Sequence, residues 1–224
     1  MHPRSPKPEP ITPRLLLRAY ASGLFPMAED AGDDALFWFD PSERGIFPLD
    51  GLIVSRSLAR TIRGETFEIR IDSDFEGVIA GCAESRPGRE KTWINKTIAA
   101  LFRELFETGF VHTVEAWRDG QLVGGLYGLA LGGAFFGESM FHRATDASKV
   151  CLTYLVARLR MGGFALLDAQ FITPHLASLG AVEIARADYR RRLEEALTRQ
   201  SDFTLLDPKA TPEAVLTWAR ARAE

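Results

Sequence analysis

Asp168 and Gln170 have the residue types and spacing that most clearly indicate chemistry. They lie at the end of an apolar run, residues 164–169, which is short enough for a buried strand. Side chains at i and i+2 of a strand leave the same face, so this carboxylate and carboxamide should point together. α/β sheets commonly open a ligand crevice at such strand ends. A carboxylate that only caps a loop is the structural alternative, and the sequence leaves both open.

Glu138 is a second candidate because it follows an uncharged segment, residues 121–137, and is flanked by aromatic residues. A charge in apolar surroundings needs a partner. The carboxylate therefore suits the binding of a substrate ammonium group, and an ion pair with a buried arginine is the alternative.

Other kinds of site find less support in the sequence. The four histidines form no close ligand pair, and the glycines of residues 124–128 do not satisfy the dinucleotide-binding pattern. Cys151 lies in an apolar helix, where packing in the core is favoured over nucleophilic catalysis. Ser139 is not in a nucleophile elbow. We therefore expect neither a metal site nor a dinucleotide site.

The elements that would position these residues follow from periodicity. Alternating runs at residues 111–117, 122–131 and 134–141, separated by Asp119-Gly120 and Gly132-Gly133, predict an antiparallel meander. A helix over residues 146–161 and the buried strand then imply a crossover. This order resembles the GNAT acyltransferase fold, so we expect an α/β (α+β) protein with a mixed central sheet. The glycine-rich loop that holds the pyrophosphate of coenzyme A is missing from residues 141–149.

The first third of the chain is expected to form a separate unit. Residues 1–72 are predicted to form a small N-terminal domain with a Pro-rich start, and residues 73–224 form the larger domain. Ser55 is expected to cap a short helix that carries Arg56, Arg60 and Arg63 on one face. Phosphate groups are the natural ligand for such a face, and a merely solvated surface is the alternative.

Composition and charge limit the possible classes. The chain has 224 residues, of which 46% are hydrophobic and 25% charged, which excludes a disordered protein. The net charge of −3 means that any nucleic-acid partner must use a segregated basic patch. Two distant cysteines fit a reducing, cytoplasmic compartment, and we expect no signal peptide and no membrane segment.

Several short motifs, in order, resemble the leucyl/phenylalanyl-tRNA protein transferase family over roughly residues 12–198. They include Gly137-Glu138-Ser139-Met140-Phe141, Ala147-Ser148-Lys149, Asp168-Ala169-Gln170, Ser178-Leu179-Gly180-Ala181, Trp38-Phe39-Asp40-Pro41, Arg44-Gly45 and Thr92-Trp93-Ile94. The resemblance implies an enzyme that moves leucine or phenylalanine, and conceivably methionine, from aminoacyl-tRNA to a protein beginning with arginine or lysine. The product would be marked for N-end rule degradation.

The resemblance also assigns roles to matching positions. It implies that Asp168 and Gln170 are catalytic and that Glu138 binds near the reacting amine. It places Trp38, Trp93, Phe135 and Leu152 around the aminoacyl-adenosine end, and it implies no metal or small cofactor. On this basis we expect Arg56, Arg60 and Arg63 to bind tRNA.

Two other readings compete. One is a coenzyme A dependent GNAT-type acyltransferase, against which the missing pyrophosphate loop argues. The other is a non-catalytic RNA- or peptide-binding module, in which Asp168 and Gln170 would be structural. We expect a monomer that does not associate with membranes.

Overall fold

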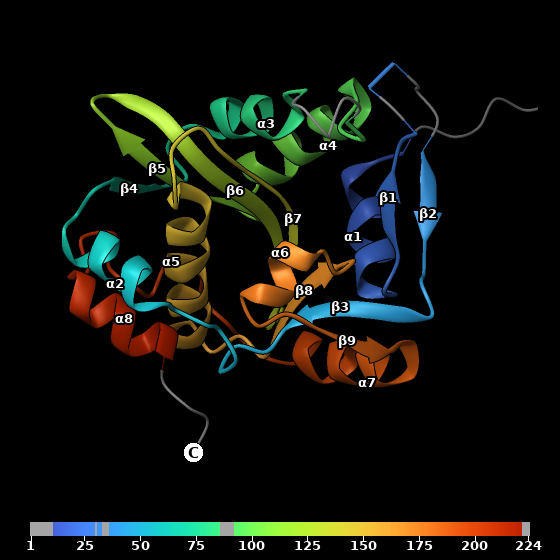
Figure 1. The fold of residues 1–224 in the computed structure, drawn as a ribbon. Helices are drawn as coiled ribbons and strands as arrows, with labels where there is room; N and C mark the ends of the chain where they lie inside the picture. Colours follow the sequence, from blue (N-terminus) through green and yellow to red (C-terminus); the bar gives the residue numbers. More distant parts are fainter. Residues whose placement is uncertain (1–10, 30, 33–35, 86–91, 221–224) are drawn as a thin grey trace, which may run out of the picture.

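The centre of the protein is a seven-stranded mixed sheet (Figure 1). The computed structural model describes residues 11–29, 31–32, 36–85 and 92–220. In spatial order the strands are β4 (Glu68–Ile71), β5 (Val111–Arg118), β6 (Gln121–Leu131), β7 (Ala134–His142), β8 (Leu166–Gln170), β3 (Glu43–Phe47) and β9 (Val182–Ala185). Neighbouring strands are antiparallel except β7 and β8, which are parallel. The expected mixed sheet is confirmed.

The predicted meander is β5, β6 and β7. Its two turns use backbone conformations with positive φ, at Asp119 and Gly120 and again at Gly132. Pairing aligns Val114 with Leu126 and Leu126 with Met140, so alternate side chains of three strands share one face.

The crossover from β7 to β8 is helix α5 (Ala147–Met161), as the periodicity predicts. Gly124 of β6 permits its close approach, because a Cβ on Gly124 would lie 2.5 Å from the Cβ of Ala147. Helices α2 (Arg56–Arg63) and α8 (Pro212–Arg220) pack against α5. Together they cover one face of the sheet over an apolar core (Figure 1).

A second apolar core lies across the sheet, under helices α1 (Pro13–Ala21), α3 (Phe75–Ala83), α4 (Lys96–Glu107) and α7 (Arg186–Leu197). Three of these helices begin at capped positions, where Thr12, Asp74 and Asn95 each accept a backbone N–H. The short helix α6 (Pro174–Ser178) follows β8.

The N-terminal third is divided between two sheets. β1 (Phe25–Met27) and β2 (Phe37–Phe39) form a separate two-stranded sheet, whereas β3 and β4 join the central one. A domain boundary at residue 72 therefore stays a prediction, and the Pro-rich first ten residues lie outside the described ranges. None of the helices that the structure describes combines the length and apolar character needed to cross a bilayer.

Candidate active site

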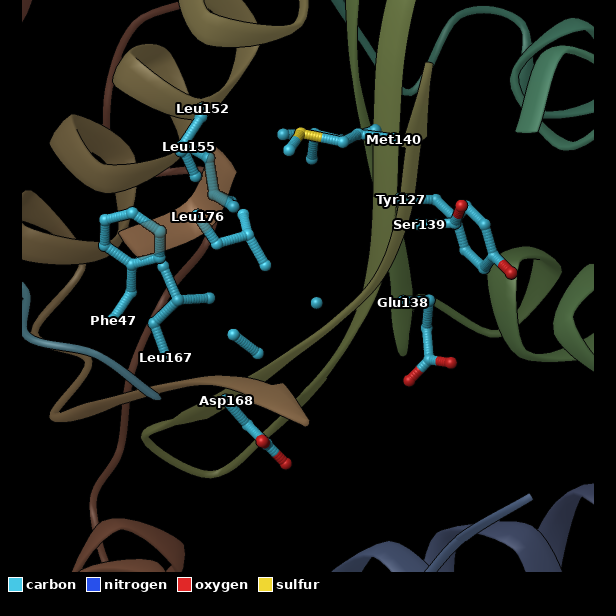
Figure 2. Close-up of a pocket in the computed structure, with 13 residues that line it drawn as sticks. Phe47, Tyr127, Glu138, Ser139, Met140, Leu152, Leu155, Leu167, Asp168 and Leu176 are labelled. Atoms are coloured by element: carbon cyan, nitrogen blue, oxygen red, sulfur yellow. The ribbon is translucent and has the colours of Figure 1, made fainter. Parts of the chain in front are cut away.

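A cavity opens where β7 and β8 separate. The two strands pair only through Ala134–Phe136 and Leu166–Asp168, although β7 continues to His142. Beyond the paired segment lies a cavity of about 110 Å³ (Figure 2). Its walls are mostly apolar, from Phe47, Leu126, Met140, Leu152, Leu155, Leu167 and Leu176. Glu138 and Asp168 also line it, so an apolar space adjoins two carboxyl groups.

Asp168 is fully buried and makes four hydrogen bonds. Arg44 donates from Nε to Oδ1 at 2.9 Å and from Nη2 to Oδ2 at 2.5 Å. The Tyr189 hydroxyl donates to Oδ2 at 2.7 Å, and the Gln170 N–H donates to Oδ1 at 2.8 Å. Both carboxylate oxygens are thus fully used by protein donors.

Arg44 is the charged partner that makes this burial possible. Burial by itself lowers the pKa of the guanidinium, but the hydrogen bond and the charge of Asp168 outweigh it and raise the pKa above its ordinary value. The guanidinium lies 4.3 Å from the ring centre of Phe25 and 4.4 Å from that of Tyr189. It also donates to the Gly23 carbonyl at 3.0 Å. One side chain therefore joins the N-terminal segment, β8 and α7.

Gln170 has an unusual backbone conformation. Its φ of 63° lies in the left-handed region, which glutamine rarely adopts. The Asp168 carboxylate holds its N–H, and its side-chain amide donates to Glu138 Oε1 at 3.0 Å. Strained backbone of this kind concentrates at functional sites, where the surrounding structure imposes it.

Glu138 has one oxygen that is satisfied and one that is not. Oε1 also accepts the Tyr20 hydroxyl at 2.7 Å, whereas buried Oε2 has no hydrogen-bond partner in the described part of the chain. Burial raises the pKa of Glu138 to about 8, although its two hydrogen bonds oppose the shift. The Tyr127 hydroxyl is likewise buried and without a partner there. This corner can therefore accept a further hydrogen-bond donor or a cation.

Comparison with known proteins gives the family. The model for leucyl/phenylalanyl-tRNA protein transferase matches residues 46–194, and the model for the N-terminal domain of that family matches residues 9–42. This chain belongs to the leucyl/phenylalanyl-tRNA protein transferase family. The separate N-terminal family model also supports the expected small N-terminal domain.

Curated relatives of this transferase family agree with that assignment. The leucyl/phenylalanyl-tRNA–protein transferase of Paramagnetospirillum magneticum is 59% identical over 87% of this chain and 93% of its own length. The protein of the same name from Rhodospirillum rubrum is 58% identical over 87% of this chain and 92% of its own. The chain is therefore a transferase, and it shares nearly the whole length of these relatives.

The structure brings together some of the residues that the sequence singled out. Asp168, Gln170 and Glu138 are joined by hydrogen bonds, and Leu152 lines the cavity. Phe135 does not line it. Its ring is fully buried, stacked on Phe203 with centroids 5.6 Å apart.

Trp38 and Trp93 lie outside the cavity wall. Trp38 is in β2 with 37% of its surface exposed, and Trp93 is partly buried against the core under α1 and α4. Their predicted contact with an adenosine stays a prediction.

The three predicted tRNA-binding arginines lie on α2 and are all exposed. Arg63 pairs with Glu213 of α8 at 2.7 Å. No ion pair involves Arg56 or Arg60 among the described residues. Two of the three guanidinium groups are therefore available to a ligand.

Other sequence interpretations can also be compared with the structure. Cys151 is fully buried, and burial raises the pKa of its thiol, which confirms the expected core packing. Within the described ranges no group of three histidine, cysteine or acidic residues could hold a metal ion.

Sequence reasoning missed the residues that hold the two carboxyl groups. Arg44, Tyr20 and Tyr189 were given no role, yet each is buried and bonded to Asp168 or Glu138. Arg44 offered one signal, because it immediately precedes the short apolar run of β3. Its pairing with a residue 124 positions away could not be derived from local pattern.

Proposed function

We propose that this chain transfers leucine or phenylalanine, with methionine as a further donor, from aminoacyl-tRNA to the N-terminal arginine or lysine of a protein. Family membership supports the reaction class. The observation that most supports the proposal is the apolar cavity, which ends at three residues joined by hydrogen bonds, Glu138, Gln170 and Asp168. The product is a protein with a new apolar N-terminus, which suits a degradation signal.

The cavity supports the choice of amino acid. Its apolar walls would gain from burying a leucine or phenylalanine side chain. A charged side chain would lose its hydration without finding a partner there. Discrimination between apolar donors would be weaker, since one methylene is worth about 1 to 3 kcal/mol in such a pocket.

The polar end of the cavity supports the proposed aminoacyl transfer. An aminoacyl ester is already activated, so the acceptor amine has to attack the ester carbonyl, lose a proton and release the ribose oxygen, which gains one. Because Asp168 uses both oxygens for protein donors, we assign it an indirect role that positions Gln170. Glu138, with its free Oε2 and a pKa near that of an amine, holds the acceptor ammonium and takes its proton.

The remaining predicted residues would act around this centre. We propose that Trp38 and Trp93 contact the terminal adenosine, and that Phe135 supports the cavity from the core. Arg56, Arg60 and Arg63 would bind tRNA phosphates. No cofactor is required because the ester supplies the activation. Aminoacyl-tRNA as donor implies work in the cytoplasm, and the chain is proposed to act as a monomer.

A mass-spectrometric transfer assay tests the proposal. Leucyl-tRNA and a peptide that begins with arginine should give a peptide heavier by one leucine residue, and the same peptide with an acetylated N-terminus should not react. Absence of transfer would support a binding module. Transfer only with an acyl-coenzyme A donor would support the acetyltransferase alternative.

The role of Gln170 has its own test. Gln170→Ala should reduce turnover by about 10² to 10³-fold, the usual cost of removing one positioned hydrogen-bond donor at a reaction centre, while tRNA affinity stays nearly constant. Combining it with Asp168→Asn should cost less than the product of the two single effects, because the two residues act as one unit. Fully multiplicative losses would show that they act separately.

A further inference from the structure

The N-terminus of α5 is open to a ligand. Asp146, at the capping position, has a left-handed backbone and its side chain caps no N–H. The N–H groups of Ser148 and Lys149 have no hydrogen-bond partner among the described residues. Unpaired N–H groups at the start of a 15-residue helix carry partial positive charge and favour an anion.

Ser148 gives an independent indication of a ligand. Only 4% of this residue is exposed, and its side chain lines the hollow in front of the helix, between residues 142–146 and His175. Its hydroxyl makes no hydrogen bond to any part of the chain that the structure describes. The hydroxyl is therefore left to bind water or a ligand that enters the hollow.

Basic side chains gather around the same hollow. Partial burial lowers the pKa of His175, and the nearby charges of Lys149 and His142 lower it further. Lys149 pairs with Asp146 at 2.9 Å, and Arg143 at the edge pairs with Glu84. Asp146 is thus the acidic residue that lines the hollow, against several basic ones. These ion pairs balance the charges of Lys149 and Arg143, so the attraction for an anionic ligand comes from the unpaired N–H groups at the positive end of the helix dipole.

The hollow adjoins the aminoacyl cavity. Leu152, one helical turn after Ser148, and Leu176, which follows His175, both line that cavity. Four residues of helix span about 6 Å. In an aminoacyl nucleotide the ester oxygen and the 5′ phosphate are attached to the same ribose, so a side chain in the cavity brings a phosphate close by.

We propose that the N-terminus of α5, with Ser148, Lys149 and His175, binds a phosphate of the 3′-terminal nucleotides of the aminoacyl-tRNA. This inference rests on the proposed function and adds a site distinct from the arginines of α2. Backbone N–H groups and a serine hydroxyl bind the phosphate oxygens here, without the glycine-rich loop that a pyrophosphate would need.

The test compares two stable analogues of the aminoacyl-tRNA end, 3′-leucylamido-3′-deoxyadenosine with and without a 5′ phosphate. Calorimetry should show that the phosphate strengthens binding to the wild-type protein by about 10- to 100-fold. Ser148→Ala combined with Lys149→Gln should abolish this gain while binding of the unphosphorylated analogue stays the same. Lys209→Gln, an exposed lysine outside the hollow, is the control and should keep the gain.

The outcomes separate this inference from the proposed function. If neither analogue binds the wild-type protein, the proposed function fails and the inference with it. If both analogues bind equally well, the function stands and the phosphate site is overturned. If inorganic phosphate binds in a Ser148-dependent way but the 5′ phosphate adds nothing, the site takes a free anion and the tRNA assignment is overturned. A gain that survives in the double variant also contradicts it.

Discussion

The sequence indicates a catalytic role for Asp168, but the surroundings of its carboxylate indicate a positioning role. Its two oxygens accept from Arg44, Tyr189 and the Gln170 N–H, which leaves no lone pair facing a substrate. The carboxylate instead holds the backbone N–H of Gln170, whose left-handed conformation needs such support. The sequence left two interpretations of Asp168 open, a catalytic carboxylate and a loop cap. The structure supports a combination of the two, because Asp168 caps the backbone of Gln170 and in this way positions a residue of the candidate site.

The first prediction concerns the stability that this carboxylate contributes. Asp168→Asn leaves the Arg44 charge buried without a counter-charge, so the free energy of unfolding should fall by about 3 to 5 kcal/mol. Urea denaturation measures this change. Asp40→Asn is the matched control, because Asp40 pairs with exposed Arg186 and Arg190 and should cost about 1 kcal/mol or less. Equal losses in the two variants would contradict the buried ion pair as a stabilising unit.

The second prediction concerns Glu138 and pH. Its pKa is about 8 in the folded state against 4.5 in the unfolded chain, so the folded state binds more protons between these values. The contribution of this raised pKa is fully present below pH 4.5 and is lost as pH rises toward 8. Stability should therefore fall over that interval, with a limiting slope of about 1.4 kcal/mol per pH unit from this group.

Glu138→Gln removes this titration and keeps the shape. The difference in unfolding free energy between the variant and the wild-type protein should thus move in favour of the variant as pH rises from 5 to 8. Chemical denaturation at each pH measures it. A constant difference across the interval would show that the pKa of Glu138 is not raised in the folded state, and the match to the pKa of an amine, on which its proposed role as proton acceptor rests, would be lost.

At the scale of elements, the separation of β7 from β8 creates the site. α5 supplies one wall of the cavity and the two strands supply others, while Phe47 of β3, Leu126 of β6 and Leu176 of α6 complete the lining. Gly137 lies at the point of divergence, where a Cβ would meet the Asp168 carbonyl oxygen at 3.2 Å. Close packing there keeps the strands together just before they part.

The third prediction follows from this geometry. Leu155→Phe adds volume to the cavity wall, so transfer of phenylalanine should fall relative to leucine by about 10- to 100-fold, since leucine is smaller. Competition between the two aminoacyl-tRNAs in one reaction measures the ratio and cancels any loss of folded enzyme. Leu205→Phe, at an exposed position, should leave the ratio unchanged. An unchanged ratio in Leu155→Phe would place the side-chain pocket elsewhere.

The elements were predictable wherever their signals are local. Turn residues such as Asp119 and Gly120 mark the meander, and Ser55 marks the start of α2. The insertion of β3 between β8 and β9 has no such signal, because strand pairing over more than a hundred positions depends on the whole fold. Arg44 lies in that strand, so its ion pair with Asp168 could not be predicted from the sequence for the same reason.

At the scale of the whole molecule, charge is divided unevenly. The chain carries a net charge of −3, yet α2 presents Arg56, Arg60 and Arg63 together to solvent. Long-range attraction of tRNA by the whole protein is therefore excluded, and a local patch must supply it. Arg63 shares its charge with Glu213, so it should contribute less than the other two.

The last prediction tests this division by salt dependence. Each phosphate contact adds about 0.7 to 0.9 to the slope of log affinity against log salt, because binding releases counterions. Arg56→Glu with Arg60→Glu should reduce the slope by about 1.4 to 1.8, equally for tRNAs of different sequence, since phosphate contacts carry no sequence information. Arg63→Glu alone should reduce it less, owing to Glu213. Arg191→Glu on α7 is the control, an exposed arginine already paired with Asp188, and should leave the slope unchanged. If the control lowers the slope as much as the α2 variants do, tRNA binding follows the overall charge and the α2 patch is not the tRNA site.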